Sequence, residues 1–168
     1  MSAADTVERD AFVARFGGVF EHSPWIAAAA FDAGLPAAAM TAEGLHRCLV
    51  AALRAGSEAQ KRALIAAHPD LAGRLAAAGR LTPDSRKEQA SAGLDLLSDG
   101  ERARFAALNE RYKAKFDLPF IMAVTGRSQE EILAAFERRL AHDKAQEVAT
   151  ALAEIERIAL LRLKEMLP

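Results

Sequence analysis

Alanine-rich runs recur along the whole chain, and no other feature restricts the possible folds as strongly. Alanine is the best helix former, and stretches of alternating Val, Ile, Thr and Tyr, which are typical of strands, are nearly absent. The 168 residues are 51% hydrophobic and 27% charged, which is typical of a soluble globular protein long enough to bury a core. The sequence therefore predicts one compact all-α domain over residues 1–168, built from roughly eight or nine helices, several of them short.

Residues with helix-capping side chains indicate where most of these helices begin and end. The first predicted helices are Ser23-Pro24 to Phe31, Thr41 to Gly56, Ser57 to before Pro69, and Asp70 to about Gly79. Later starts are Thr82-Pro83, the capping boxes Ser98 with Glu101 and Ser128 with Glu131, and Asp143, which opens the longest helix, to about Leu167. Leu118–Gly126 could be a strand by composition, but because no second strand is available, we predict a short buried helix or an irregular turn.

Charge and cysteine content exclude several partners and locations. The formal net charge is −1 and no basic block is present, so we expect no nucleic-acid partner. Cys48 is the only cysteine, which rules out a disulfide framework and favours a reducing compartment. The chain begins without the apolar segment of a secretory signal, its longest apolar run is too short to span a membrane, and it does not end in a peroxisomal tripeptide. We therefore expect a cytoplasmic protein with no membrane partner.

His68 precedes a proline in the stretch IAAHPDLAGR, residues 65–74. A residue before proline is pushed out of helical geometry, so His68 is expected at a helix end with its ring off the helical face. A helix C-terminus also favours a protonated imidazole, and Asp70 is a good cap for the next helix. Two interpretations remain open: a corner between helices, or a histidine placed for chemistry.

Polar side chains share one face of the helix predicted in TPDSRKEQASAGL, residues 82–94. Ser85 and Glu88 are three residues apart and Ser85 and Gln89 are four apart, so all three lie together beside small side chains. A hydroxyl, a carboxylate and an amide in such surroundings can form the wall of a polar pocket. The alternative is an ordinary solvated helix face.

An arginine lies within the apolar stripe of the last predicted helix. The stripe repeats every three or four residues and consists of Val148, Leu152, Ile155, Ala159, Arg162 and Met166. Arg157 lies on the opposite face. Because a core-facing arginine must find an anion or lose its hydration at high cost, Arg162 is expected to form a structural ion pair, for instance with Glu88, to extend toward solvent, or to bind an anionic substrate.

Five stretches follow one another in order across nearly the whole chain: FEHSPWIA (20–27), AHPDLAG (67–73), SRKEQASAGLD (85–95), LNERYKAKFDLPFIMAV (108–124) and EIERIALLRL (154–163). None is decisive alone, but their order and spacing resemble the family of 2-oxo-4-hydroxy-4-carboxy-5-ureidoimidazoline (OHCU) decarboxylases of urate breakdown. The resemblance implies an all-helical fold, usually a homodimer, and decarboxylation of this small anionic ureido-imidazoline to (S)-allantoin without a cofactor.

The same resemblance implies roles for individual residues. His68 is the catalytic, proton-transferring histidine, and Glu88 and Arg162 bind and polarise the substrate. The implied lining of the site is Pro69, Ser85 and Gln89, with the backbone of Phe120, Ile121, Met122, Ala123 and Val124. The chain departs from the family pattern at Thr125, where a basic residue is more usual, and at His142, where Asn is more usual; neither belongs to the implied catalytic set.

Other conspicuous residues are interpreted as structural. His22, His46 and His142 lack the spacing of a zinc site, so no metal site is predicted. The residues interpreted as core by helical spacing or size are Trp25, Phe12, Phe16, Phe20, Phe31 and Cys48. The runs GERARF and FERRL are interpreted as solvated helix faces with i,i+4 ion pairs.

Two alternatives to a decarboxylase remain open. One is a non-catalytic helical interaction module, in which the HPD is a corner and Arg162 a structural ion pair; it predicts no turnover and a larger apolar surface patch than a homodimer needs. The other is a metal-dependent helical enzyme, which EDTA would inactivate.

Overall fold

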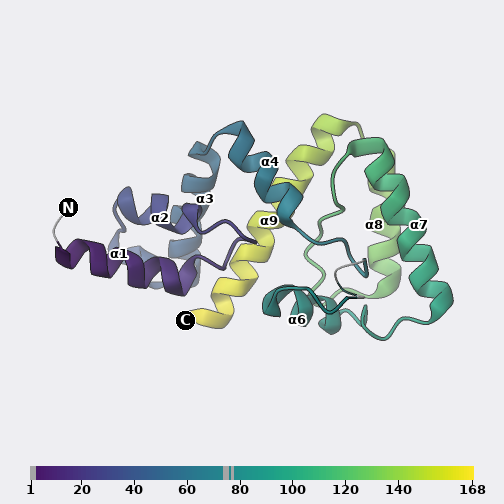
Figure 1. Cartoon of the computed structure of the whole chain (residues 1–168), viewed down its shortest axis with the longest axis horizontal. Helices are drawn as coiled ribbons and strands as arrows, with labels where there is room; N and C mark the ends of the chain where they lie inside the picture. The colour runs from purple at the N-terminus through teal and green to yellow at the C-terminus, as the bar shows by residue number, and fades with distance from the viewer. Residues whose placement is uncertain (1–2, 74–75, 77) are drawn as a thin grey trace. The chain divides into compact units, whose positions relative to one another are not determined.

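The computed structural model describes residues 3–73, 76 and 78–168, and within these residues it contains eight α-helices, one 3₁₀-helix and no strand (Figure 1). The elements are α1 (Ala3–Phe16), α2 (Trp25–Asp32), η1 (Ala37–Met40), α3 (Ala42–Ala55), α4 (Glu58–Ala67), α6 (Pro83–Ser91), α7 (Asp99–Phe116), α8 (Gln129–Leu140) and α9 (Lys144–Met166). The predicted all-α class is confirmed. The short helix predicted from Asp70 to about Gly79 runs through residues 74, 75 and 77 and so lies outside the described residues. No helix of the described chain is long and apolar enough to cross a membrane.

Most helices begin where their capping side chains predict. The side chains that accept a hydrogen bond from the amide three residues on are Thr41, Ser57, Thr82, Ser98, Ser128 and Asp143. At Ser98 and Ser128 the glutamate three residues on also accepts from the amide of the serine, which completes both predicted capping boxes. These interactions connect neighbours in the sequence, which is why the sequence alone locates them.

One predicted cap is wrong. Helix α2 begins at Trp25 and ends at Asp32, and Pro24 rather than Ser23 precedes its first residue. The hydroxyl of Ser23 donates to the carbonyl oxygen of Glu21 over 3.0 Å, so it closes a turn with the preceding chain rather than accepting from a helix amide.

The described chain divides into two compact units. Unit 1 comprises the residues up to Ala67 together with Glu156–Pro168, and unit 2 comprises His68–Ile155. In unit 1, α1 packs on α2 and α3 packs on both α2 and η1. The large side chains that are fully buried there include Ile26, Leu45, Leu49, Leu53, Leu64 and Ile65. Folding of residues 1–168 as a single domain stays a prediction.

Gly44 permits the close packing of α3 on η1. A Cβ atom at this position would lie 1.5 Å from the carbonyl oxygen of Ala38, so only glycine fits here.

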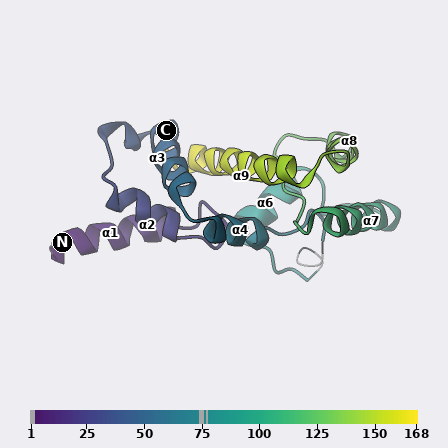
Figure 2. The same cartoon turned by 90° about the horizontal axis from the view of Figure 1, so that it is seen from above.

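A hydrophobic cluster forms the core of unit 2, whose helices can be followed in Figures 1 and 2. Its buried members are Leu71, Ala72, Ala92, Leu94, Leu97, Phe105, Leu108, Tyr112, Phe116, Phe120, Val124, Ile132, Ala135 and Phe136. Within it the rings of Phe120 and Phe136 stack with 3.7 Å between centroids, and the ring of Tyr112 meets Phe120 edge-on at 5.2 Å.

The segment Leu118–Gly126 connects α7 to α8 without helix or strand, which confirms the predicted irregular turn. Helix α7 ends at Phe116 because Asp117 adopts left-handed geometry, with φ of 53°. The side chains of Phe120, Ile121 and Val124 are buried, so the segment lies inside the unit although it has no regular hydrogen-bond pattern.

The predicted stripe of α9 is buried in its middle. Ile155 and Ala159 are buried, and Arg162 is buried with them at 6% exposure. Met166 is exposed, which corrects the prediction at that position: it is the last residue of the helix, where the stripe ends. Arg157 is exposed on the opposite face, as predicted.

Candidate active site

His68 directly follows the last residue of α4, Ala67, which confirms that the histidine before proline ends the helix. Its side chain is buried, with 8% of the residue exposed. We call residues 68–73 the HPD loop. The imidazole therefore leaves the helix where the chain turns, in a buried position that a simple surface corner would not require.

Neutral side chains of two helices hold the HPD loop. Gln89 of α6 uses both ends of its amide: its Oε1 accepts from the amide of Ala72 at 2.9 Å and its Nε2 donates to the carbonyl oxygen of Asp70 at 3.4 Å. Asn109 of α7 donates to the carbonyl oxygen of Leu71 at 2.9 Å. Three consecutive residues that follow the histidine and proline are thus tied to the helices beside them.

Two further features accompany these contacts. Ala72 has a positive φ of 50°, an uncommon geometry for a residue with a side chain, and its bond to Gln89 helps to maintain it. Lys113 of α7 donates to the Oδ2 atom of Asp70 over 2.5 Å, while the buried Oδ1 atom of Asp70 has no hydrogen-bond partner in the described chain.

The polar face predicted on α6 is largely buried. Ser85 and Gln89 are 4% and 5% exposed, and Glu88 between them is partly buried. This distribution does not fit an ordinary solvated face. Since Gln89 is engaged with the HPD loop, the face that presents Glu88 lies against the segment that follows His68.

Side chains of α8 and α9 fix the Leu118–Gly126 segment at two main-chain positions. The Nη1 atom of Arg139 donates to the carbonyl oxygen of Ile121 at 2.6 Å, and the amide of Ala123 donates to the Oε2 atom of Glu154 at 2.8 Å. No hydrogen bond within the described chain engages the amides of Met122 or Val124. These amides are donors that the segment can offer to a ligand.

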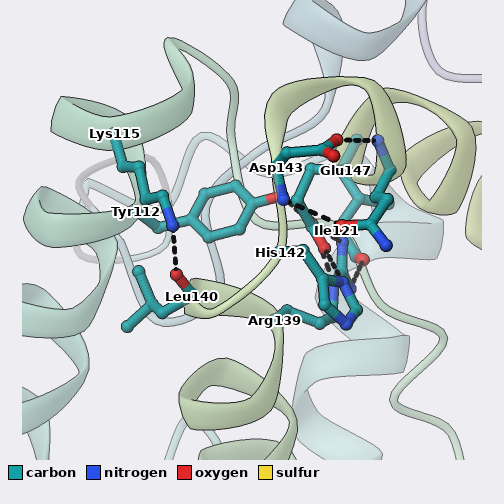
Figure 3. A network of polar contacts seen from close by, with 9 residues as sticks. Tyr112, Lys115, Ile121, Arg139, Leu140, His142, Asp143 and Glu147 are labelled. Carbon is teal, nitrogen blue, oxygen red and sulfur yellow. Dashed lines mark hydrogen bonds and ion pairs between the residues drawn. The ribbon is translucent and has the colours of Figure 1, made fainter.

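Arg139 belongs to a buried polar network (Figure 3), in which side chains from α7, α8, α9 and the turn before α9 converge. Its Nε and Nη2 atoms lie 3.0 and 2.9 Å from the Oε2 atom of Glu147, to which the hydroxyl of Tyr112 also donates. The Oε1 atom of Glu147 lies 2.8 Å from Nδ1 of His142. The network places the almost fully buried side chains of Arg139 and Glu147 next to the Leu118–Gly126 segment.

The pKa values within this network are shifted. Burial opposes ionisation of Glu147, but hydrogen bonds from Arg139, Tyr112 and His142 outweigh it and hold the pKa of this carboxyl below its usual value. Burial, followed by the hydrogen bond to Glu147, raises the pKa of the Tyr112 hydroxyl. Glu147 is therefore an anion and Tyr112 a neutral donor at neutral pH.

The buried arginine of this network corrects the interpretation of FERRL as a solvated face. Arg138 is exposed as predicted, but Arg139 is only 4% exposed. The sequence does contain one signal for the burial of Arg139, namely Glu147. This glutamate precedes Ala151 and Ile155 at intervals of four and so continues the apolar stripe of α9. An acidic residue in a core-facing stripe requires a cation, just as Arg162 requires an anion.

Arg162 lies in unit 1, where it meets an acidic partner. Its Nη1 atom is 3.0 Å from the Oε2 atom of Glu21 and 3.2 Å from the carbonyl oxygen of Val19. Glu21 is 2% exposed, so the pair is a buried one. The partner found here is Glu21, whereas the sequence suggested Glu88 as the example of a structural partner.

Three of the predicted site regions share one core. Leu71 and Ala72 of the HPD loop, Ala92 at the end of α6, and Phe120 and Val124 of the connecting segment all belong to the hydrophobic cluster of unit 2. Unit 2 therefore holds His68, the α6 face and the connecting segment, and unit 1 holds Arg162.

The remaining candidates occupy other positions. His22 is exposed, and Nε2 of His46 lies 2.7 Å from the carbonyl oxygen of Glu156. Cys48 is only half-buried and, with Trp25, lines a cavity of about 500 Å³ in unit 1, which corrects its interpretation as a buried small hydrophobe. Among the described residues, no group of three or more His, Cys, Asp and Glu side chains is placed to hold a metal ion.

Known proteins resemble this chain along most of its length. The sequence model of OHCU decarboxylase matches residues 5–164. The OHCU decarboxylase of Haloferax volcanii is 38% identical over 165 residues, covering 98% of this chain and 94% of that protein. The uric acid degradation bifunctional protein of a Bacillus species is 35% identical over 155 residues, covering 92% of this chain and 30% of that protein.

A solved structure also resembles the fold. The crystal structure of (S)-allantoin synthase matches with a TM-score of 0.75 and 30% identity over 95% of this chain, which spans 50% of that longer chain. These matches place the protein among the carboxy-lyases. The chain belongs to the OHCU decarboxylase family, which confirms the family predicted from its five motifs.

Proposed function

We propose that this protein decarboxylates OHCU to (S)-allantoin in urate degradation and uses no cofactor. The observation that supports this most strongly is the family match over residues 5–164, which includes the HPD loop, the α6 face and the connecting segment. The names of the relatives support the substrate and the pathway, and that of the solved (S)-allantoin synthase supports the product.

The chemistry of this substrate suits a site without a cofactor. OHCU bears a carboxylate and a hydroxyl on one ring carbon, next to a carbon doubly bonded to nitrogen. When the bond to the carboxylate breaks, carbon dioxide leaves, the electron pair forms a carbon–carbon double bond, and the imine nitrogen takes the displaced pair and a proton. The enol then loses its hydroxyl proton while the neighbouring carbon gains one. Because the imine accepts the electrons, the reaction requires neither pyridoxal nor a metal, and EDTA is expected to leave activity unchanged.

The proposal assigns His68 as the group that transfers the proton to one face of that carbon, since an imidazole exchanges protons near neutral pH. Glu88 hydrogen-bonds the substrate's N–H groups or sets the protonation state of His68. Arg162 binds a substrate oxygen through its planar guanidinium and stabilises developing charge. The proposed lining is Pro69, Ser85 and Gln89, with the main chain of Phe120, Ile121, Met122, Ala123 and Val124.

A stereochemical assay tests this proposal. The substrate is made fresh from urate with urate oxidase and hydroxyisourate hydrolase, because it decays unaided to racemic allantoin. Added protein should produce a circular dichroism signal of (S)-allantoin, and His68→Asn should remove most of it. His22→Asn is the matched control: His22 is exposed with φ of 48°, a geometry that asparagine tolerates, so this variant should keep full activity.

The outcomes are distinct. A racemic trace no faster than the blank would contradict the decarboxylase proposal and favour the interaction module. Chiral product at an undiminished rate from His68→Asn would contradict only the role of the histidine. Inactivation by EDTA would instead support a metal-dependent enzyme.

We also propose that the protein acts as a cytoplasmic homodimer, as the family resemblance implies. Light scattering during size-exclusion chromatography should give twice the chain mass of 18.0 kDa. A mass of one chain at micromolar concentration would contradict the dimer.

A further inference from the structure

The shape of the Leu118–Gly126 segment depends on tertiary contacts. Apart from one turn, in which the amide of Arg127 donates to the carbonyl oxygen of Val124, it has neither helical nor strand hydrogen bonding. A main chain that binds a substrate has to present its amides and carbonyls in fixed positions, and displacement by about 1 Å can reduce kcat/KM by up to about 100-fold. The residues that fix this segment are therefore expected to matter for activity even without touching the substrate.

Arg139 contacts two consecutive residues of the segment. Its Nη1 atom donates to the carbonyl oxygen of Ile121 at 2.6 Å, and its guanidinium carbon lies 4.3 Å from the centre of the Phe120 ring. One side chain thus holds a main-chain carbonyl and covers the neighbouring ring, which is itself stacked on Phe136.

Glu147 fixes the orientation of Arg139. Both Nε and Nη2 of the guanidinium face the Oε2 atom of Glu147, which leaves Nη1 directed at Ile121. Tyr112 donates to the same Oε2 atom of Glu147, and Nδ1 of His142 lies against its Oε1 atom. Because a guanidinium is planar, contacts along one edge determine where its other donors point.

The cost of this arrangement indicates that it serves geometry rather than stability. Removing two charges from water costs about as much as their attraction returns, so a buried ion pair adds little net stability over apolar side chains of similar volume. Apolar side chains could not, however, hold the Ile121 carbonyl. The feature that distinguishes the charged pair from an apolar filling is this main-chain contact.

A second carboxylate anchors the segment two residues further on. The Oε2 atom of Glu154 in α9 accepts from the amide of Ala123 at 2.8 Å. A donor from α8 and an acceptor from α9 thus hold main-chain groups on both sides of Met122, whose own amide has no partner in the described chain.

We infer that Arg139 and Glu154 are positioning residues for the proposed reaction: they fix the Ile121 carbonyl and the Ala123 amide, so that the main chain of Phe120–Val124 meets the substrate in one geometry. The inference rests on the proposed function. Beyond the residues proposed to contact the substrate, it assigns a role to two residues that hold the main chain in place. Their loss should weaken substrate binding more than proton transfer.

Arg139→Lys is the decisive variant. Lysine keeps a positive charge beside Glu147 but lacks the planar fork that also reaches Ile121. We expect a rise in KM of about tenfold or more, with kcat changed less than about threefold. The reason is that the lost contacts stabilise the bound substrate and the transition state equally. His68→Asn should show the opposite, a fall in kcat.

Two controls separate positioning from general destabilisation. Arg138→Lys changes the exposed neighbouring arginine and should leave both constants unchanged. Ile132→Ala opens a cavity in the same helix and cluster but removes no hydrogen bond to the segment, because the isoleucine side chain has no donor or acceptor. If it lowers the urea midpoint as much as Arg139→Lys does, it should still keep a near-normal KM at 25 °C.

Glu154 gives an independent test. Glu154→Gln retains an oxygen that can accept from the Ala123 amide and should keep KM within about threefold of wild type, whereas Glu154→Ala should raise it about tenfold, as for a lost positioning contact. Equal effects of the two substitutions would overturn the role of this contact.

The inference fails if wild type forms (S)-allantoin and folded Arg139→Lys has an unchanged KM, or if Ile132→Ala raises KM equally at matched stability. Absence of chiral product from wild type would instead overturn the proposed function itself.

Discussion

The HPD loop and the Leu118–Gly126 segment are both irregular, yet they are held by different chemistry. Neutral amides of Gln89 and Asn109 hold the HPD loop, together with an ion pair at its edge. A buried guanidinium and two carboxylates hold the connecting segment. Neutral contacts can be lost one at a time, whereas loss of either member of a buried charge pair leaves the other uncompensated. Substitutions in the contacts of the connecting segment should therefore lower the free energy of unfolding more than substitutions in the contacts of the HPD loop.

The largest effect is expected at Glu147. Glu147→Leu leaves Arg139 charged and buried, which should lower the free energy of unfolding by about 3–5 kcal/mol in urea titrations. The triple variant Arg139→Met, Glu147→Leu, Tyr112→Phe should recover most of this loss while remaining impaired in KM. A loss below about 1 kcal/mol in the single variant would show that the pair is not isolated from water, contrary to its burial.

The next largest effect is expected at Gln89. Gln89→Ala leaves the amide of Ala72 and the carbonyl of Asp70 without their partner and should cost about 1–3 kcal/mol. Asn109→Ala should cost less, because it frees one carbonyl and also removes a buried Oδ1 atom that has no partner in the described chain. The comparison of both unfolding midpoints checks this, and the reverse order would contradict it.

Acid should weaken the contacts that hold the connecting segment. The pKa of Glu147 lies below its usual value of 4.5, so its ionisation stabilises the fold above about pH 4.5 and this contribution is lost as the pH falls through the lowered pKa. The melting temperature of wild type should therefore fall more steeply below pH 4.5 than that of Glu147→Gln. Parallel curves would show that Glu147 does not contribute to acid sensitivity.

The smallest effect is expected at the edge of the HPD loop. Lys113 pairs with Asp70, but the lysine side chain is 45% exposed, so Lys113→Met should change the free energy of unfolding by only about 0.2–1 kcal/mol. The change should shrink further in 0.5 M salt, where surface charges are screened. A loss as large as that of Gln89→Ala would show that this ion pair, rather than the amide, holds the loop.

The sequence predicted those features that depend on near neighbours. Thr41, Ser98 and Ser128 mark helix starts because each cap joins residues three apart. His68 was placed at a helix end because proline acts on the residue before it, whatever the fold. The prediction of Ser23 as the N-cap of α2 is wrong because its hydroxyl donates to a competing acceptor in the preceding turn.

Other features depend on which helices meet, and near neighbours do not reveal this. The run FERRL resembles a solvated face until α7 and α9 bring Tyr112 and Glu147 to Arg139. Gln89 was predicted to lie at the site, but its engagement with the HPD loop follows only from the packing of α6 against that loop. The burial of Arg162 was predictable from its stripe, whereas the identity of Glu21 as its partner was not, because that residue lies 141 positions earlier.

The buried pair of Arg139 and Glu147 also limits how this sequence can drift. A lineage that changes either position first passes through an intermediate with a lone buried charge. The free-energy cost of that charge approaches the whole stability of an ordinary domain. Drift at these two positions is therefore expected to be coupled, while Gln89 and Asn109 can change in separate small steps. A library randomised jointly at both positions and selected for folding should return both charges or neither.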